Sequence, residues 1–86
     1  MDIGVEISLY PLTADYAPHI RDFVARFNAD ARFRVQTNSM STQVFGAFDP
    51  LMDALRQQMR TTLAALSAGP QRAVFVLKVY GPLPPA

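Results

Sequence analysis

The sequence has no cysteine and only one histidine, His19. The absence of cysteine excludes disulfides, thiolate metal sites and thiol catalysis, and a single histidine excludes a histidine-rich metal site within one chain. Charge is also scarce: eight Lys or Arg against seven Asp or Glu leave a net charge of +1. This balance gives no reason to expect nucleic acid or an acidic membrane surface as a partner.

Long hydrophobic runs are missing as well, and none approaches the roughly 20 residues that a membrane-spanning helix needs. Residues 1–4 carry no basic segment before an apolar one, so we expect no signal peptide, no membrane insertion and a cytoplasmic location. Apolar residues are nevertheless abundant, at 50% of the 86-residue chain, which favours a folded domain over residues 1–80. The proline-rich segment 81–86 is expected to be an extended tail.

Four segments have the alternation or the β-branched content that is typical of strands, namely 3–10, 33–38, 42–48 and 73–80. In the first, Ile3, Val5, Ile7 and Leu9 would point to one face, and Pro11 is expected to end the strand. The second and third are separated by a turn-like segment and predict a hairpin.

Two segments predict helices. Apolar residues recur at helical spacing from Ile20 to Phe27, with Asp15 as the expected N-cap and Pro18 in the first turn. The second helix is expected to begin with Asp49 as N-cap and to end at Gly69, with the glycine in a left-handed conformation.

This order of elements predicts an α+β, ferredoxin-like (ACT-like) β-α-β-β-α-β sandwich. Its antiparallel four-stranded sheet has the order 4-1-3-2, and both helices cover one face. The topology brings the end of the first strand, the start of the first helix and the hairpin to one end of the sheet. Neutral hydrogen-bonding residues gather there, namely Tyr10, Thr13, Asn38, Ser41 and Thr42.

These residues allow two interpretations. Asn38, Ser41 and Thr42 can simply satisfy the backbone of a hairpin, as Asn and Ser do in many turns. They can also form a small-ligand site, in which the ring of Tyr10 stacks on an aromatic ligand or meets a cation.

The last strand is apolar on both faces, so we expect a second subunit to cover the open sheet face, in a homodimer or a dimer of dimers. Glu6 and Phe45 are expected near that open face. Glu6 either pairs with Arg34 or Lys78 across the sheet or accepts a cationic or amino-bearing ligand.

Catalysis is poorly supported by the sequence. Acid–base chemistry would favour a second carboxylate beside Glu6 on the same strand face, and none is present. An acylphosphatase-like reaction needs a glycine-rich phosphate cradle and an arginine after the first strand, and residues 10–15 contain neither. We therefore expect a non-enzymatic protein without catalytic residues, metal ligands or a cofactor.

Two stretches go beyond generic patterning: Ser-Leu-Tyr-Pro-Leu at residues 8–12, and Met40-Ser41-Thr42 followed by Gly46 and Asp49. Together they resemble the YkoF-like family of thiamine- and hydroxymethylpyrimidine-binding proteins, over roughly residues 5–80. The resemblance implies a ferredoxin-like domain that binds thiamine or its pyrimidine moiety without turning it over, in uptake, salvage or sensing.

The resemblance places the ligand site at Ser8, Tyr10, Asn38, Ser41 and Thr42. Glu6 and Phe45 are added from their chemistry and strand parity, so the expected partner is a thiamine- or hydroxymethylpyrimidine-type small molecule. The alternative is a structural or regulatory module that resembles ACT-type domains and uses its sheet face for assembly.

Overall fold

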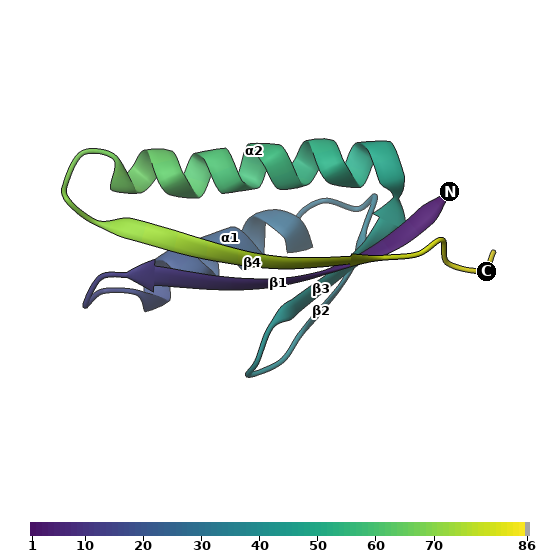
Figure 1. The fold of residues 1–86 in the computed structure, drawn as a ribbon, viewed down its shortest axis with the longest axis horizontal. Helices are drawn as coiled ribbons and strands as arrows, with labels where there is room; N and C mark the ends of the chain where they lie inside the picture. Colours follow the sequence, from purple (N-terminus) through teal and green to yellow (C-terminus); the bar gives the residue numbers. More distant parts are fainter. Residues whose placement is uncertain (86) are drawn as a thin grey trace.

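The computed structural model describes residues 1–85 and contains six elements. They are β1 (Asp2–Leu12), α1 (Ala17–Asn28), β2 (Arg34–Thr37), β3 (Thr42–Ala47), α2 (Phe48–Leu66) and β4 (Arg72–Tyr80). The strands form one antiparallel sheet in the order β2-β3-β1-β4, with α2 lying along one face (Figure 1). The predicted α+β fold and the strand order 4-1-3-2 are confirmed.

The core lies between the helices and the face of the sheet that they cover. The alternation in β1 buries Ile3, Val5 and Ile7 on that face, and Val44 of β3 joins them. Both helices contribute to the same cluster with Phe23, Phe27, Leu51 and Leu55. The rings of Phe23 and Phe27 meet edge to face, with centroids 5.3 Å apart.

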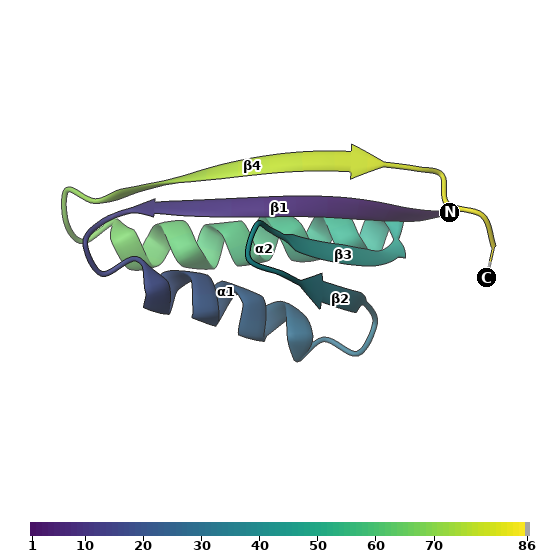
Figure 2. The ribbon, with the colours of Figure 1, turned by 90° about the horizontal axis from the view of Figure 1, so that it is seen from below.

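Strand β1 is longer than the hairpin beside it. β3 pairs with β1 only as far as Ile7, which lies opposite Thr42, whereas β4 accompanies β1 to Leu12. Residues 8–12 of β1 therefore have a strand neighbour on one side only. Figure 2 shows β1 and β4 continuing together past the end of the β2–β3 hairpin.

The expectation that Pro11 ends the first strand is wrong, because Pro11 lies within β1 opposite Ala73. Proline lacks the backbone N–H that a central strand must donate, but it is tolerated where one edge of the strand is unpaired. Pro11 stands in that unpaired stretch, so it costs the sheet no hydrogen bond on the open side.

Three predicted helix ends differ from the structure. Tyr16, not Asp15, occupies the N-cap of α1. α2 follows β3 directly and begins at Phe48, so Asp49 lies in its first turn, where a negative charge still favours the helix dipole. α2 ends at Leu66, and the only glycine with positive φ in residues 1–85 is Gly81 rather than Gly69.

The chain after β4 forms neither helix nor strand in residues 81–85, and the backbone N–H of Leu83 donates to the carbonyl of Asp2 at 2.8 Å. This bond holds the described part of the expected tail beside the start of β1, and Ala86 lies outside the described residues. Within residues 1–85, neither helix combines the length and the apolar character that crossing a membrane requires.

A polar clasp joins the two helices. The guanidinium group of Arg26 on α1 donates to the side-chain oxygen of Gln58 and, at 2.8 Å, to the hydroxyl of Thr62 on α2. Thr62 is 3% exposed, so its hydroxyl depends on this partner.

We expect Thr62→Val to lower the free energy of unfolding by about 1–2 kcal/mol, because the isosteric side chain removes the acceptor of a charged donor. The neighbouring Thr61 is exposed and donates to the carbonyl of Gln57 in its own helix. Thr61→Val is therefore the matched control, with an expected loss below about 0.5 kcal/mol. Urea denaturation of both variants measures the difference, and equal losses would contradict the role of the clasp.

Candidate functional site

A cavity of about 420 Å³, called the main cavity below, lies where β1 extends past the hairpin. Its walls come from the end of β1, the first two turns of α1 and the hairpin tip between β2 and β3. Apolar side chains include Ile7, Leu9, Ile20, Phe23 and Val24, and polar groups come from Ser8, Tyr10, Asn38, Ser41 and Thr42. The volume falls within the range of about 300–1,000 Å³ that is usual for small-molecule sites.

The hairpin tip is held by Asn38. Its side-chain oxygen accepts hydrogen bonds from the backbone N–H groups of Met40, at 2.8 Å, and Ser41, at 3.1 Å. The backbone N–H of Asn38 also donates to the carbonyl of Ser41 at 3.0 Å. Asn38 therefore satisfies the hairpin, as one of the two interpretations expects, while its Nδ2 group stays available as a donor beside the main cavity.

Ser41 and Thr42 are adjacent in sequence but face opposite sides of the sheet. Thr42 is 6% exposed and lies on the helix side, with its hydroxyl 3.4 Å from that of Thr37. The hydroxyl of Ser41 donates to Oε2 of Glu6 at 3.0 Å on the other side. The hairpin tip thus presents one hydroxyl to each face of the sheet.

A second, smaller depression of about 290 Å³ lies on the face of the sheet that the helices leave open, and we call it the open-face hollow. It is lined by Glu6, Ser8, Tyr10, Met40, Ser41, Val76 and Lys78. Ser8, Tyr10, Met40 and Ser41 line the main cavity as well. The two depressions are therefore neighbours that share the end of β1 and the hairpin tip.

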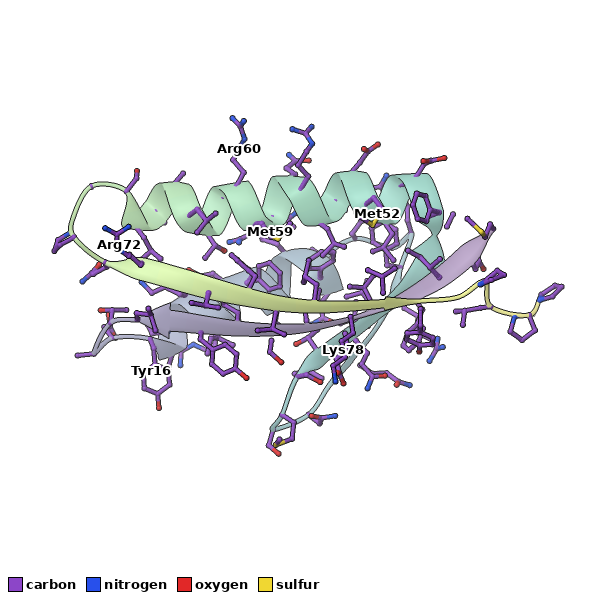
Figure 3. The ribbon with its side chains drawn as sticks, in the orientation of Figure 1. Tyr16, Met52, Met59, Arg60, Arg72 and Lys78 are labelled. Atoms are coloured by element: carbon purple, nitrogen blue, oxygen red, sulfur yellow. The ribbon has the colours of Figure 1, made fainter. Side chains whose placement is uncertain are left out.

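Glu6 pairs with Lys78, its cross-strand neighbour, with 3.8 Å between Oε1 and Nζ. Figure 3 shows Lys78 on the side of the sheet away from α2, near the hairpin. The sequence suggested two cationic side chains as ion-pair partners of Glu6, and Lys78 is the one that pairs with it. Arg34 instead places its guanidinium group 4.0 Å from the ring centroid of Phe45.

Phe45 lies on the open face, opposite Gly4, and lines neither depression. The rings of Phe45 and Tyr80 are nearly perpendicular and meet edge to face, with centroids 6.3 Å apart. A Cβ atom at Gly4 would come within 2.5 Å of the Tyr80 ring, so glycine is what lets this ring lie against β1. Phe45 and Tyr80 thus form an aromatic cluster away from the two depressions.

The structure brings together most of the residues singled out in the sequence. Ser8, Tyr10, Asn38, Ser41 and Thr42 line the main cavity, Glu6 lines the open-face hollow, and Thr13 lines neither. Sequence reasoning missed Tyr16 and Met40. Tyr16 stands directly before the first helix, at the end of the sheet where the polar residues were expected to converge, so its position was the available signal.

The main cavity is uncharged: its lining contains no Asp, Glu, Lys, Arg or His. Away from it, side-chain and backbone hydrogen bonds from Arg32 lower the pKa of Asp30 in the loop between α1 and β2. In the described part of the chain, no three His, Asp or Glu side chains gather in a group that could hold a metal ion. Because its lining carries no charged side chain, the main cavity is suited to a neutral ligand with an aromatic or apolar body.

A sheet of order 4-1-3-2 with two helices on one face and a small-ligand cavity at one end defines a ferredoxin-like α+β domain. The family model of the YKOF-related family matches residues 2–67, and the chain belongs to that family. The match covers β1 through α2 and ends before β4. No curated protein matches the chain.

Several solved structures share the fold. A hypothetical protein from Methanocaldococcus jannaschii has a TM-score of 0.79 at 23% identity, covering 99% of this chain and 84% of that one. A Thermotoga maritima protein provisionally assigned to thiamine biosynthesis or salvage has a TM-score of 0.74 at 20% identity, covering 92% and 82%. A Streptococcus pneumoniae protein has a TM-score of 0.79 at 18% identity, covering 96% and 89%. At these identities the likeness concerns the fold.

Proposed function

We propose that this protein binds thiamine or its hydroxymethylpyrimidine precursor in the main cavity, without turning it over, in thiamine uptake, salvage or sensing. The observation that carries the proposal is an uncharged cavity where hydroxyl groups and aromatic rings meet at the end of β1. Membership of the YKOF-related family and the likeness to the Thermotoga maritima protein support it.

The chemistry of an aminopyrimidine matches this lining. The ligand offers a flat aromatic face, ring nitrogens that accept hydrogen bonds and an amino group that donates them. The hydroxyls of Ser8 and Thr42 can both donate and accept, the hydroxyl of Ser41 can accept while it donates to Glu6, and Tyr10 and Tyr16 offer rings for stacking. Each satisfied neutral hydrogen bond would contribute about 0.5–1.5 kcal/mol.

The unpaired edge of β1 adds backbone groups to the same site. In an antiparallel sheet, alternate residues direct their N–H and C=O groups to the same edge, and β3 no longer covers that edge at residues 8–12. Pro11 removes one donor from this stretch. The remaining groups can provide the paired donor and acceptor contacts that a pyrimidine nitrogen and its neighbouring amino group require.

A binding protein is favoured over an enzyme because the main cavity contains no carboxylate or histidine to act as a general acid or base. The second candidate function is an ACT-like module that assembles through its sheet face. It is favoured by the exposed apolar residues of β4, which include Val74, Val76 and Tyr80 on the open face.

Calorimetric titration with thiamine and with hydroxymethylpyrimidine tests the proposal. We expect saturable binding of at least one, and a Ser41→Ala/Thr42→Val double variant that folds but binds about 5- to 150-fold more weakly. Gln36→Ala is the matched control, because Gln36 is exposed on β2 and lines neither depression.

Absence of heat and of a melting-temperature shift with both ligands at millimolar concentration would overturn the binding proposal and favour the assembly module. Binding that is equally strong in the double variant and in Gln36→Ala would place the ligand away from the hairpin tip.

A further inference from the structure

The open-face hollow has a charge character that the main cavity lacks. Glu6 is the only carboxylate in the lining of either depression, and it stands on β1 two residues before Ser8, which both depressions share. Two residues along a strand span about 7 Å, and their side chains point to the same face. A ligand seated against Ser8 and Tyr10 in the main cavity can therefore extend a second group to Glu6.

The two oxygens of Glu6 are engaged differently. Oε2 accepts the hydroxyl hydrogen of Ser41 at 3.0 Å, which links the carboxylate to the hairpin tip. Oε1 faces Nζ of Lys78 at 3.8 Å, a distance that is long for a charge-assisted hydrogen bond. The Lys78 side chain is 77% exposed, so the free-energy cost of separating it from Glu6 and solvating its ammonium group is small.

We propose that Glu6 recognises a positive charge on the ligand and so makes the site distinguish cationic thiamine from its uncharged pyrimidine precursor. This inference rests on the proposed function: the aminopyrimidine ring occupies the main cavity, and the thiazolium ring, one methylene group away, lies in the open-face hollow. Lys78 yields Oε1 to the thiazolium ring, Ser41 keeps Oε2 in place, and the ring of Tyr10 borders both positions.

Three ligands separate charge from shape in the test: thiamine, a neutral thiamine analogue with thiophene in place of thiazolium, and hydroxymethylpyrimidine. We expect Glu6→Gln to weaken thiamine binding about tenfold or more, because the amide can still accept from Ser41 but carries no charge. The two neutral ligands should change by less than about twofold. Lys78→Gln should strengthen thiamine binding by up to about fivefold, because it removes the competing cation.

Asp53→Asn is the matched control for net charge, since it also removes one carboxylate but lies exposed on α2, outside both depressions. Light scattering checks that every variant keeps the oligomeric state of the parent chain. Equal responses of thiamine and its neutral analogue to Glu6→Gln, or no response of either, would overturn this inference and leave the proposed function standing. Failure of the parent chain to bind any of the three ligands would overturn the proposed function and this inference with it.

Discussion

The Val76→Glu variant is expected to behave in solution as a 9.5 kDa monomer, whereas the parent chain is expected to form a homodimer or a dimer of dimers. Val76 lies opposite Ser8 on the open face of edge strand β4 and is 46% exposed. Val74 and Tyr80 extend the same apolar surface. A carboxylate placed in the middle of a packed interface would lose its hydration without a partner, and the assembly would lose most of its stability.

Leu63 provides the matched control. It is 45% exposed, close to the 46% of Val76, but it lies on α2 rather than on the sheet. Leu63→Glu is expected to keep the parent's mass in light scattering at micromolar concentration, whereas Val76→Glu halves it or lowers it further. A parent chain that is a stable monomer at that concentration would refute the expected assembly, and dissociation by both variants alike would move the interface away from the open sheet face.

The Tyr10→Ala variant is expected to lose about 5- to 150-fold of its affinity for hydroxymethylpyrimidine, because stacking of a base-like ring on an aromatic side chain is worth about 1–3 kcal/mol. Tyr10 is 51% exposed and borders both depressions, so its ring is free to receive a ligand. Tyr10→Phe keeps the ring and is expected to lose less than about threefold.

Tyr80→Ala controls for the loss of an exposed tyrosine from the same sheet face, since Tyr80 is 47% exposed and lines neither depression. Titration calorimetry compares the three variants with the parent chain. If Tyr10→Ala and Tyr80→Ala bind equally well, the stacking partner is not Tyr10, and a site between subunits on the open face near Glu6 becomes the better hypothesis.

The sequence predicts the six elements and their order well, because residue periodicity reports which side of an element is buried. The two-residue period of β1 identifies Ile3, Val5 and Ile7 as core without any knowledge of their partners. Helix ends are less predictable. Asp49 followed by proline is a strong local signal for an N-cap. No loop separates β3 from α2, however, and the helix begins at the residue that follows the end of the strand.

The main cavity itself could not be predicted from the sequence, because it depends on a difference in strand length. Pro11 predicts that the first strand ends just before it, and a strand of that length would extend only slightly past the end of the hairpin. Only the pairing of Pro11 with Ala73 reveals that β1 continues to Leu12 while β3 leaves it at Ile7. The sequence left the partner of Glu6 undecided for a similar reason, because the choice between Arg34 and Lys78 depends on the registers of three strand pairings.

The place of β1 in the sheet has a consequence for biosynthesis. β1 is central in the sheet and is synthesised well before its neighbour β4, so Gly4 cannot pair with Tyr80 until the residues between them have been made. Closing such a long loop makes folding slow compared with the formation of helices and hairpins. Until then the nascent chain holds β1 with a bare edge on the β4 side, a surface that chaperones and other nascent strands can recognise.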